Sequence, residues 1–239
     1  MNNSLHLSSD PVLLLTRPVA QARQFANGLS PHVLAAIQLV VSPALEIRPA
    51  QPLPDLKRYQ GLIMTSRNAV QIFAHEKGQF AGPVYTIGNA TTRAAQDIGL
   101  NAIQAGQDAQ SLIATLVDKA PAGPLVHLHG AFTRGAIAAN LTQAGLPTTG
   151  HILYDQHPLL PTEQAQSALA GHNQIILPLF SPRTAQIVTT WGRPQAPLYI
   201  ICLSPAVASA AMRLEANKLV VVAQPDATAM AAAIHSLVA

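Results

Sequence analysis

The stretch that decides the fold is GLIMTSRNAVQI at Gly61–Ile72, because it returns as QIILPLFSPRTAQI at Gln174–Ile187. Each copy is an apolar strand that ends on a serine and runs directly into a helical pattern. The next segments repeat at nearly the same spacing, since Pro83–Gly88 resembles Pro197–Cys202. We infer two related α/β domains, and small ligands usually bind in the cleft between such domains.

Apolar strands alternate with helical patterns elsewhere, which predicts doubly wound parallel sheets with helices on both faces. The first two strands are predicted at Val12–Thr16 and Val33–Val41. Two extended segments, the proline-rich Ser42–Pro54 and His151–His157, are expected to cross between the domains. The predicted domains are therefore residues 1–42 plus 157–239, a discontinuous α/β domain, and residues 43–156, an inserted α/β domain that includes the linker strands.

Composition excludes several classes of protein. Apolar residues make up 49% of the chain, and its 14 basic and 11 acidic residues are scattered, which argues against a nucleic-acid-binding stripe but allows a small acidic ligand. One cysteine, Cys202, excludes a disulfide framework. No apolar run reaches the ~18 residues that span a bilayer, and the N-terminus lacks a signal-peptide pattern. We expect a cytoplasmic monomer without membrane or nucleic-acid partners.

Small, hydroxylated or basic residues follow most of the predicted strands. In parallel sheets the carboxyl ends of the strands form the ligand-binding edge, and free amides at helix N-termini favour carboxylates and phosphates. A guanidinium can hold a carboxylate through two parallel hydrogen bonds. The alternatives to ligand binding are that the hydroxylated residues only cap helices and that the arginines are solvated surface residues. The predicted substrate-binding residues are Thr16, Arg17, Thr65, Ser66, Gly88, Asn89, Ala90, Thr91, Arg134, Ser181 and Ser204.

Tyr154 lies in the second crossing segment and is the candidate catalytic residue. A phenol that faces the cleft can donate a proton to a leaving hydroxyl, whereas ordinary packing of an interdomain tyrosine is an equal alternative. His127 and His129 alternate on one strand, but no acidic residue or cysteine at matching spacing completes a metal site. The chain also lacks a glycine-rich nucleotide loop and a nucleophile elbow, so nucleotide cofactors and serine hydrolysis lose support.

Several short motifs occur along the chain: Leu14–Pro18, Met64–Ser66 followed by Asn68–Val70, Ile87–Thr91, Gly130–Arg134, Ile152–Tyr154 and Phe180–Pro182. In this order and spacing they resemble the uroporphyrinogen-III synthase family. The resemblance covers the chain after Pro11 and implies two flavodoxin-like domains joined by a two-stranded linker, the first built from both chain ends. It also implies a cyclising hydro-lyase of haem biosynthesis that needs no metal or cofactor.

The implied reaction converts hydroxymethylbilane, which carries eight carboxylates, to uroporphyrinogen III with inversion of the terminal pyrrole ring. The free substrate can close unaided to the uninverted isomer, so the protein must impose the less obvious geometry. One departure concerns Ser204–Val207, because many members have threonines where this chain has Ala206 and Val207. The alternatives are a two-domain anion-binding protein without catalysis and a nucleotide-dependent transferase, and the latter lacks its glycine-rich loop.

Overall fold

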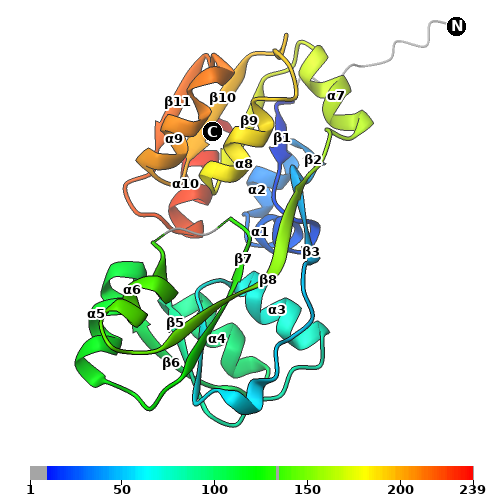
Figure 1. The fold of residues 1–239 in the computed structure, drawn as a ribbon. Helices are drawn as coiled ribbons and strands as arrows, with labels where there is room; N and C mark the ends of the chain where they lie inside the picture. The colour runs from blue at the N-terminus through cyan, green and yellow to red at the C-terminus, as the bar shows by residue number, and fades with distance from the viewer. Residues whose placement is uncertain (1–9, 133–134, 239) are drawn as a thin grey trace, which may run out of the picture. The chain divides into compact units, whose positions relative to one another are not determined.

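The computed structural model describes residues 10–132 and 135–238. The chain divides into two compact units: unit 1 comprises the residues up to Glu46 and those from Pro158 onward, and unit 2 is Ile47–His157. Both are α/β units built on mainly parallel sheets, which confirms the predicted fold class (Figure 1). The chain passes from one unit to the other within two strands, β3 (Leu45–Pro49) and β8 (Thr148–Pro158).

Unit 1 is a five-stranded sheet in the order β11-β10-β9-β1-β2, and the pairings between neighbours are parallel. If the five strands of this unit are numbered along the chain, the order read from β2 is 2-1-3-4-5, as in flavodoxin. The strand order therefore reverses between β1 and β9. Its elements are β1 (Val12–Leu15), α1 (Val19–Asn27), α2 (Pro31–Ala35), β2 (Gln38–Val41), α7 (Glu163–Ala170), β9 (Ile175–Leu179), α8 (Pro182–Val188), β10 (Leu198–Cys202), α9 (Pro205–Ala211), a 3₁₀ turn (Met212–Leu214), β11 (Lys218–Val221) and α10 (Ala227–Val238).

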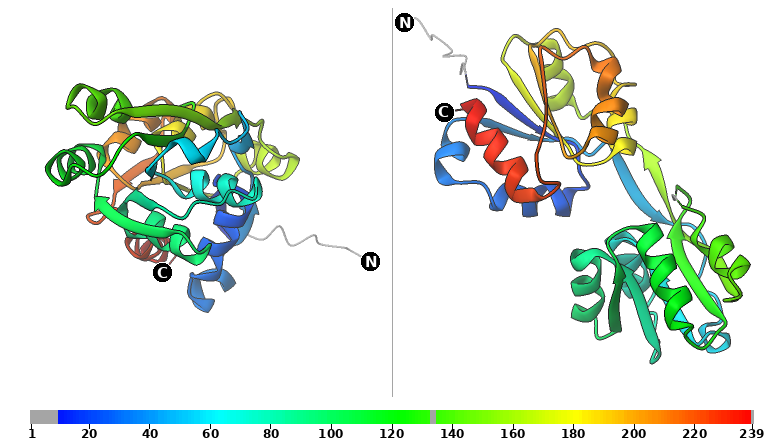
Figure 2. Two further views of the ribbon diagram at one scale, coloured as in Figure 1. Left: turned by 60° about the horizontal axis from the view of Figure 1, so that its bottom comes forward. Right: turned by 90° about the vertical axis from the view of Figure 1, so that its left-hand side faces the viewer.

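The strands at the centre of unit 1 are apolar along their whole length because helices cover both faces of the sheet. All four residues of β1 are buried. Leu13, Leu15, Ile176 and Ile201 pack on one side against α1, α2 and α10. Figure 2 (right) shows α10 (red) and α1 (dark blue) on this face, with α8 and α9 on the other.

Unit 2 is a six-stranded sheet in the order β3-β8-β7-β4-β5-β6. If β3 is left out and the other five strands are numbered along the chain, the order read from β6 is 3-2-1-4-5. The strand order therefore reverses between β4 and β7. Unit 2 therefore shares the doubly wound class of unit 1 but has a different strand order. Its further elements are a 3₁₀ turn (Leu56–Arg58), β4 (Gly61–Met64), α3 (Arg67–His75), β5 (Pro83–Ile87), α4 (Gly88–Asp97), β6 (Asn101–Gly106), α5 (Ala109–Lys119), β7 (Leu125–Gly130) and α6 (Ile137–Gln143).

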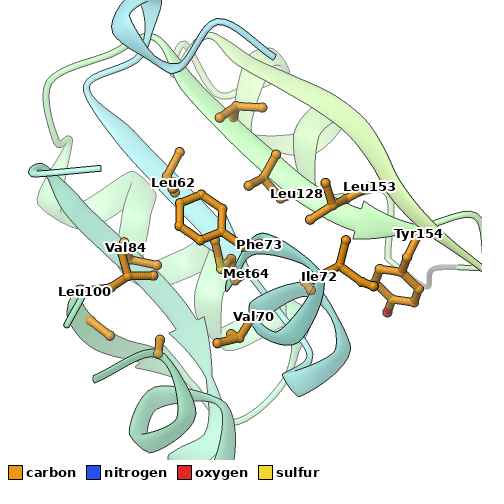
Figure 3. Close-up of a cluster of buried hydrophobic side chains, with 14 residues drawn as sticks. Leu62, Met64, Val70, Ile72, Phe73, Val84, Leu100, Leu128, Leu153 and Tyr154 are labelled. Atoms are coloured by element: carbon orange, nitrogen blue, oxygen red, sulfur yellow. The ribbon is translucent and has the colours of Figure 1, made fainter. Parts of the chain in front are cut away.

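Two hydrophobic clusters sandwich the sheet of unit 2. The cluster on the α3 and α4 face is centred on Phe73, which is fully buried among Leu62, Met64 and Leu128 (Figure 3). The cluster on the opposite face joins strand residues to Leu112 and Leu116 of α5 and to Leu141 of α6. Unit 2 thus has its own core on each side of the sheet, as a doubly wound unit requires.

The predicted strand at Val33–Val41 is only half correct. Its first part is the short helix α2, which begins with Pro31 and is capped by Ser30, whose Oγ accepts the amide of Val33 at 3.3 Å. Proline suits the first helical position and serine suits the cap, so local signals outweigh the apolar run. Only Gln38–Val41 forms the strand β2.

A short chain of hydroxyl groups holds the junction between β5 and α4. The Oγ1 atoms of Thr86 and Thr92, both buried, lie 2.7 Å apart, and Thr92 Oγ1 donates to the carbonyl of Gly88 at 3.0 Å. Thr92→Val removes the hydroxyl that bonds the buried Thr86 and the Gly88 carbonyl, so we expect the free energy of unfolding to fall by about 1–3 kcal/mol. Urea unfolding measures this loss. The exposed Thr149→Val is the control, and an equal change in both variants would contradict the expectation.

Candidate active site

The strand order of unit 2 brings four candidate residues to the carboxyl edge of its sheet. Thr65 and Ser66 follow β4, while Gly130 ends β7 and pairs with Tyr154 of β8. The reversal of strand order lies between β4 and β7, and ligands of open α/β sheets bind at such reversals. The edge beside Ser66 is therefore the candidate active site of unit 2.

Ser66 is the N-cap of α3. Its backbone is extended, with φ −146° and ψ 149°, and its Oγ accepts the amide of Ala69 at 3.2 Å. Serine is favoured at this position because its side chain satisfies one of the free amides at the start of the helix. The predicted cap is therefore present. The same oxygen also lies 2.8 Å from the Oη atom of Tyr154, so Ser66 is more than a cap.

The Tyr154 ring is packed inside unit 2 and only 5% of the residue is exposed. Figure 3 shows it at the margin of the α3 cluster beside Ile72. Both alternatives for this residue have a counterpart in the structure, because the apolar ring is packed against α3 while the hydroxyl lies beside that of Ser66. Burial raises the pKa of Tyr154, while side-chain hydrogen bonds with Ser66 and Asn68 oppose that rise in pKa.

Gly130 provides the space that the Tyr154 ring occupies. A Cβ atom on Gly130 would lie 2.6 Å from both Cε2 and Cζ of the ring and 3.0 Å from Oη. Any side chain at this position must therefore displace the ring. Gly130 belongs to one of the family motifs, but its role in positioning the phenol could not be predicted from the sequence, because the pairing of Gly130 with Tyr154 depends on the strand register.

His127 lies behind Thr65 and is 2% exposed. Its Nε2 atom is 3.3 Å from Thr65 Oγ1, and its ring lies 4.7 Å from that of His129. Burial, followed by repulsion from His129, lowers the pKa of His127 to about 3. The imidazole is therefore neutral at physiological pH. Within residues 10–132 and 135–238 no three His, Cys, Asp or Glu side chains gather to hold a metal ion.

The buried His127 makes the stability of the protein dependent on pH. Its pKa is about 3 in the folded chain and about 6.5 in the unfolded chain, so the unfolded state binds more protons between these values. Stability therefore falls as the pH drops from about 6.5 towards 3, by about 2 kcal/mol at pH 5 from this residue. Urea unfolding at pH 7 and pH 5 should show this loss. His127→Gln should remove it, whereas the exposed control His172→Gln should keep it.

The predicted residues Gly88, Asn89, Ala90 and Thr91 form the first turn of α4 rather than preceding it. Gly88 has φ +66°, a left-handed conformation that suits glycine. The N-cap residue, Ile87, makes no side-chain capping bond, so no side chain of the cap covers the first amides of α4. The Thr91 side chain is buried, whereas Asn89 and Ala90 are exposed.

The carboxyl edge of unit 1 gathers Thr16, Arg17, Ser181 and Ser204. Thr16 is fully buried, and its Oγ1 has no hydrogen-bond partner within the described ranges. The Arg17 guanidinium lies 4.1 Å from the centre of the Phe180 ring, across the reversal between β1 and β9. Thr16 and Arg17 thus lie where ligands of such a sheet bind.

The two serines of the unit 1 edge differ in their hydrogen bonds. Ser181 caps α8 by accepting the amide of Thr184 at 3.1 Å, and its hydroxyl donates to Thr184 Oγ1 at 2.9 Å. Ser204 occupies the N-cap position of α9, but its side chain makes no capping bond. The predicted residue Arg134 lies outside the described residues.

Comparison with known proteins identifies the family. The family model described as uroporphyrinogen-III synthase HemD matches residues 25–232, which is more than half of the chain. The chain belongs to the uroporphyrinogen-III synthase family. This result confirms the resemblance read from the motifs.

One protein sequence and two solved structures illustrate what this chain resembles. The uroporphyrinogen-III synthase of Chlorobaculum parvum is 27% identical over 190 residues, which cover 73% of this chain and 76% of that protein. The crystal structure of the Helicobacter pylori uroporphyrinogen-III synthetase has a TM-score of 0.71 at 14% identity, covering 95% of this chain and 99% of that one. A mutant Thermus thermophilus synthase has a TM-score of 0.54 at 10% identity, covering 95% and 98%. These structures share the fold.

Uroporphyrinogen-III synthases are cyclising lyases of haem biosynthesis, so the family and the predicted enzyme class agree. The alternative of an anion-binding protein without catalysis is not favoured by the family membership and the Chlorobaculum relative. Among the residues whose structure is described, no helix has both the length and the apolar character needed to cross a membrane.

Proposed function

We propose that this chain converts hydroxymethylbilane to uroporphyrinogen III, with inversion of the terminal pyrrole ring and loss of water. The observation that carries the proposal is the pair of hydroxyl groups of Ser66 and Tyr154, 2.8 Å apart at the carboxyl edge of unit 2, in a chain that belongs to the synthase family. A hydroxyl donor at this edge suits a reaction that begins with the departure of a hydroxyl group.

The reaction begins when the pyrrole nitrogen pushes out the substrate hydroxyl to give an azafulvenium cation. The substituted carbon of the terminal ring then attacks this cation and forms a spiro intermediate, which fragments and closes again with the ring inverted. No step needs a metal or an external cofactor. The chief task of the protein is to hold the ends of a flexible chain in the productive orientation, which contributes through proximity rather than through strong acids or bases.

The substrate carboxylates are assigned to the carboxyl edges of the two sheets. In unit 2 the amides that begin α3 and α4 offer hydrogen-bond donors to anions. In unit 1 the guanidinium of Arg17 and the buried hydroxyl of Thr16 suit the same role. Ser204 supplies a hydroxyl where Ala206 and Val207 cannot. The assigned binding residues are Thr16, Arg17, Thr65, Ser66, Gly88, Asn89, Ala90, Thr91, Arg134, Ser181 and Ser204.

Tyr154 is assigned the acid role, in which its phenol is the source of the proton needed for departure of the substrate hydroxyl. A phenol whose pKa is raised by burial stays protonated at neutral pH and so keeps the proton that this role needs. We also propose that the enzyme acts in the cytoplasm as a monomer. A single buried thiol, Cys202, is consistent with a reducing compartment.

The experiment that tests this function incubates the purified protein with freshly made hydroxymethylbilane. The products are oxidised to porphyrins, and the type I and type III isomers are separated by chromatography. The proposal predicts type III isomer in excess of the type I that forms without protein. Consumption of substrate to type I alone, or protection of the bilane without closure, would indicate a binding protein instead.

A further inference from the structure

The two serines of the internal repeat use their hydroxyl protons differently. Ser66 and Ser181 have nearly the same backbone, with φ and ψ of −146° and 149° against −148° and 148°, and each accepts the third amide of its helix. The Ser181 hydroxyl donates to Thr184 Oγ1 at 2.9 Å. The corresponding residue in unit 2 is Ala69, which has no side-chain acceptor. Ala69 therefore offers the Ser66 proton no acceptor of the kind that Thr184 provides in unit 1.

The Tyr154 hydroxyl lies beside Ser66 and needs an acceptor for its own proton. Tyr154 is 5% exposed, and a buried hydroxyl that donates to nothing costs about 1–3 kcal/mol. Ser66 Oγ, 2.8 Å away, and the Asn68 side chain are hydrogen-bond partners of the phenol, and we assign the acceptor role to Ser66. A serine oxygen has two lone pairs, and the Ala69 amide and the Tyr154 hydroxyl fill both. With the phenol assigned as the donor of this pair, Ser66 keeps its own proton for a third group.

The exposure of the two hydroxyl groups indicates which of them lies nearer the substrate. Ser66 is half-buried at the start of α3. Tyr154 is buried, and its ring packs against the backbone of Gly130. A substrate at the sheet edge therefore meets the serine before the phenol. The reversal of strand order beside Ser66 is also the place where such a sheet binds its ligand.

We propose that Ser66 is the group that gives its proton to the departing hydroxyl of the substrate, and that Tyr154 acts through Ser66. This inference rests on the proposed function and names the residue that touches the reacting atoms. As the carbon–oxygen bond breaks, its electron pair leaves with oxygen, Ser66 protonates that oxygen to form water, and Ser66 takes the phenol proton. The phenolate faces the new cation, and it regains a proton when the last ring closure releases one from carbon.

Activity measurements on five single variants and one double variant test the relay. Ser66→Ala and Tyr154→Phe should each lower kcat about a hundredfold, and the double variant should be no slower than the slower single variant, because the two residues act as one unit. Ser66→Thr should keep most of the activity because it keeps the hydroxyl. Ala69→Ser should lower kcat with the cap intact, because it gives the Ser66 proton an acceptor as in unit 1. Asp108→Ala, which removes another N-cap of unit 2, should keep wild-type activity.

A proton inventory separates the relay from a structural role. Single-turnover rates in mixtures of light and heavy water should depend quadratically on the deuterium fraction in the wild-type enzyme, because two protons move together. The dependence should become linear in Tyr154→Phe. A linear dependence in the wild type, or losses that multiply in the double variant, would overturn the relay. Full activity of Ser66→Ala beside an inactive Tyr154→Phe would show direct donation by the phenol.

The activity of the wild-type protein distinguishes failure of the relay from failure of the proposed function. All the outcomes above concern the rate at which the variants form the type III isomer. If the wild-type protein forms no type III isomer, the proposed function itself fails. If the wild type forms it and Ser66→Ala forms it equally fast, only the relay fails.

Discussion

Replacing Tyr154 with phenylalanine is expected to lower kcat about a hundredfold, at the lower end of the 10²–10⁴-fold contribution typical of general acid catalysis. Phenylalanine keeps the ring that packs beside α3 and on Gly130, so the fold should remain. Only the hydroxyl 2.8 Å from Ser66 Oγ is lost. The loss should fall on kcat rather than on KM, because this hydroxyl acts on the leaving group rather than on the substrate carboxylates.

The control for this change is Tyr85→Phe. Tyr85 is also a buried tyrosine in a strand of unit 2, but it lies on the opposite face of the sheet, in the cluster with Leu112. It should keep wild-type kcat, and both variants should unfold at nearly the same urea concentration as the wild type. Equal activity of Tyr154→Phe and wild type would remove the phenol from the mechanism.

Gly130→Ala is the second change with a large expected effect. The new methyl group would overlap the Tyr154 ring at 2.6 Å, so the ring must move and the hydroxyl must leave its position beside Ser66. We expect kcat to fall at least about tenfold and the free energy of unfolding to fall by about 1–3 kcal/mol. Steady-state kinetics and urea unfolding measure the two effects.

A double-mutant cycle identifies the cause of the Gly130→Ala effect. In a Tyr154→Ala background the ring is absent, so the stability cost of Gly130→Ala should largely disappear. Gly28→Ala is the control, since its Cβ would meet nothing nearer than 3.4 Å and its φ is −88°. An unchanged cost of Gly130→Ala in the Tyr154→Ala background would show that the ring is not the obstacle.

Much of the fold could be predicted from local sequence because buried parallel strands are apolar along their whole length. β1, β4 and β9 are such runs, and the serines that follow β4 and β9 cap α3 and α8 as the repeat indicated. The strand order of unit 2 was not predictable in this way, because it depends on which strands pair rather than on the pattern within each strand.

The details of the site depend on contacts between residues that are distant in sequence. The sequence placed Tyr154 in an extended segment, but its burial follows from the register of β8 on β7 beside Gly130. Arg17 was predicted as an anion ligand, and its stacking on Phe180 depends on the pairing of β1 with β9. The difference between Ser66 and Ser181 was visible, since Ala69 stands where the other copy has Thr184, but its meaning required the position of the phenol.

The most direct test of the account is the isomer ratio of the porphyrinogen formed from hydroxymethylbilane as the concentration of purified enzyme increases. We expect the type III fraction to rise with enzyme concentration until enzymatic closure is much faster than spontaneous closure to type I. Tyr154→Phe should need about a hundredfold more enzyme to reach the same fraction. Type I as the sole product at every enzyme concentration would contradict it.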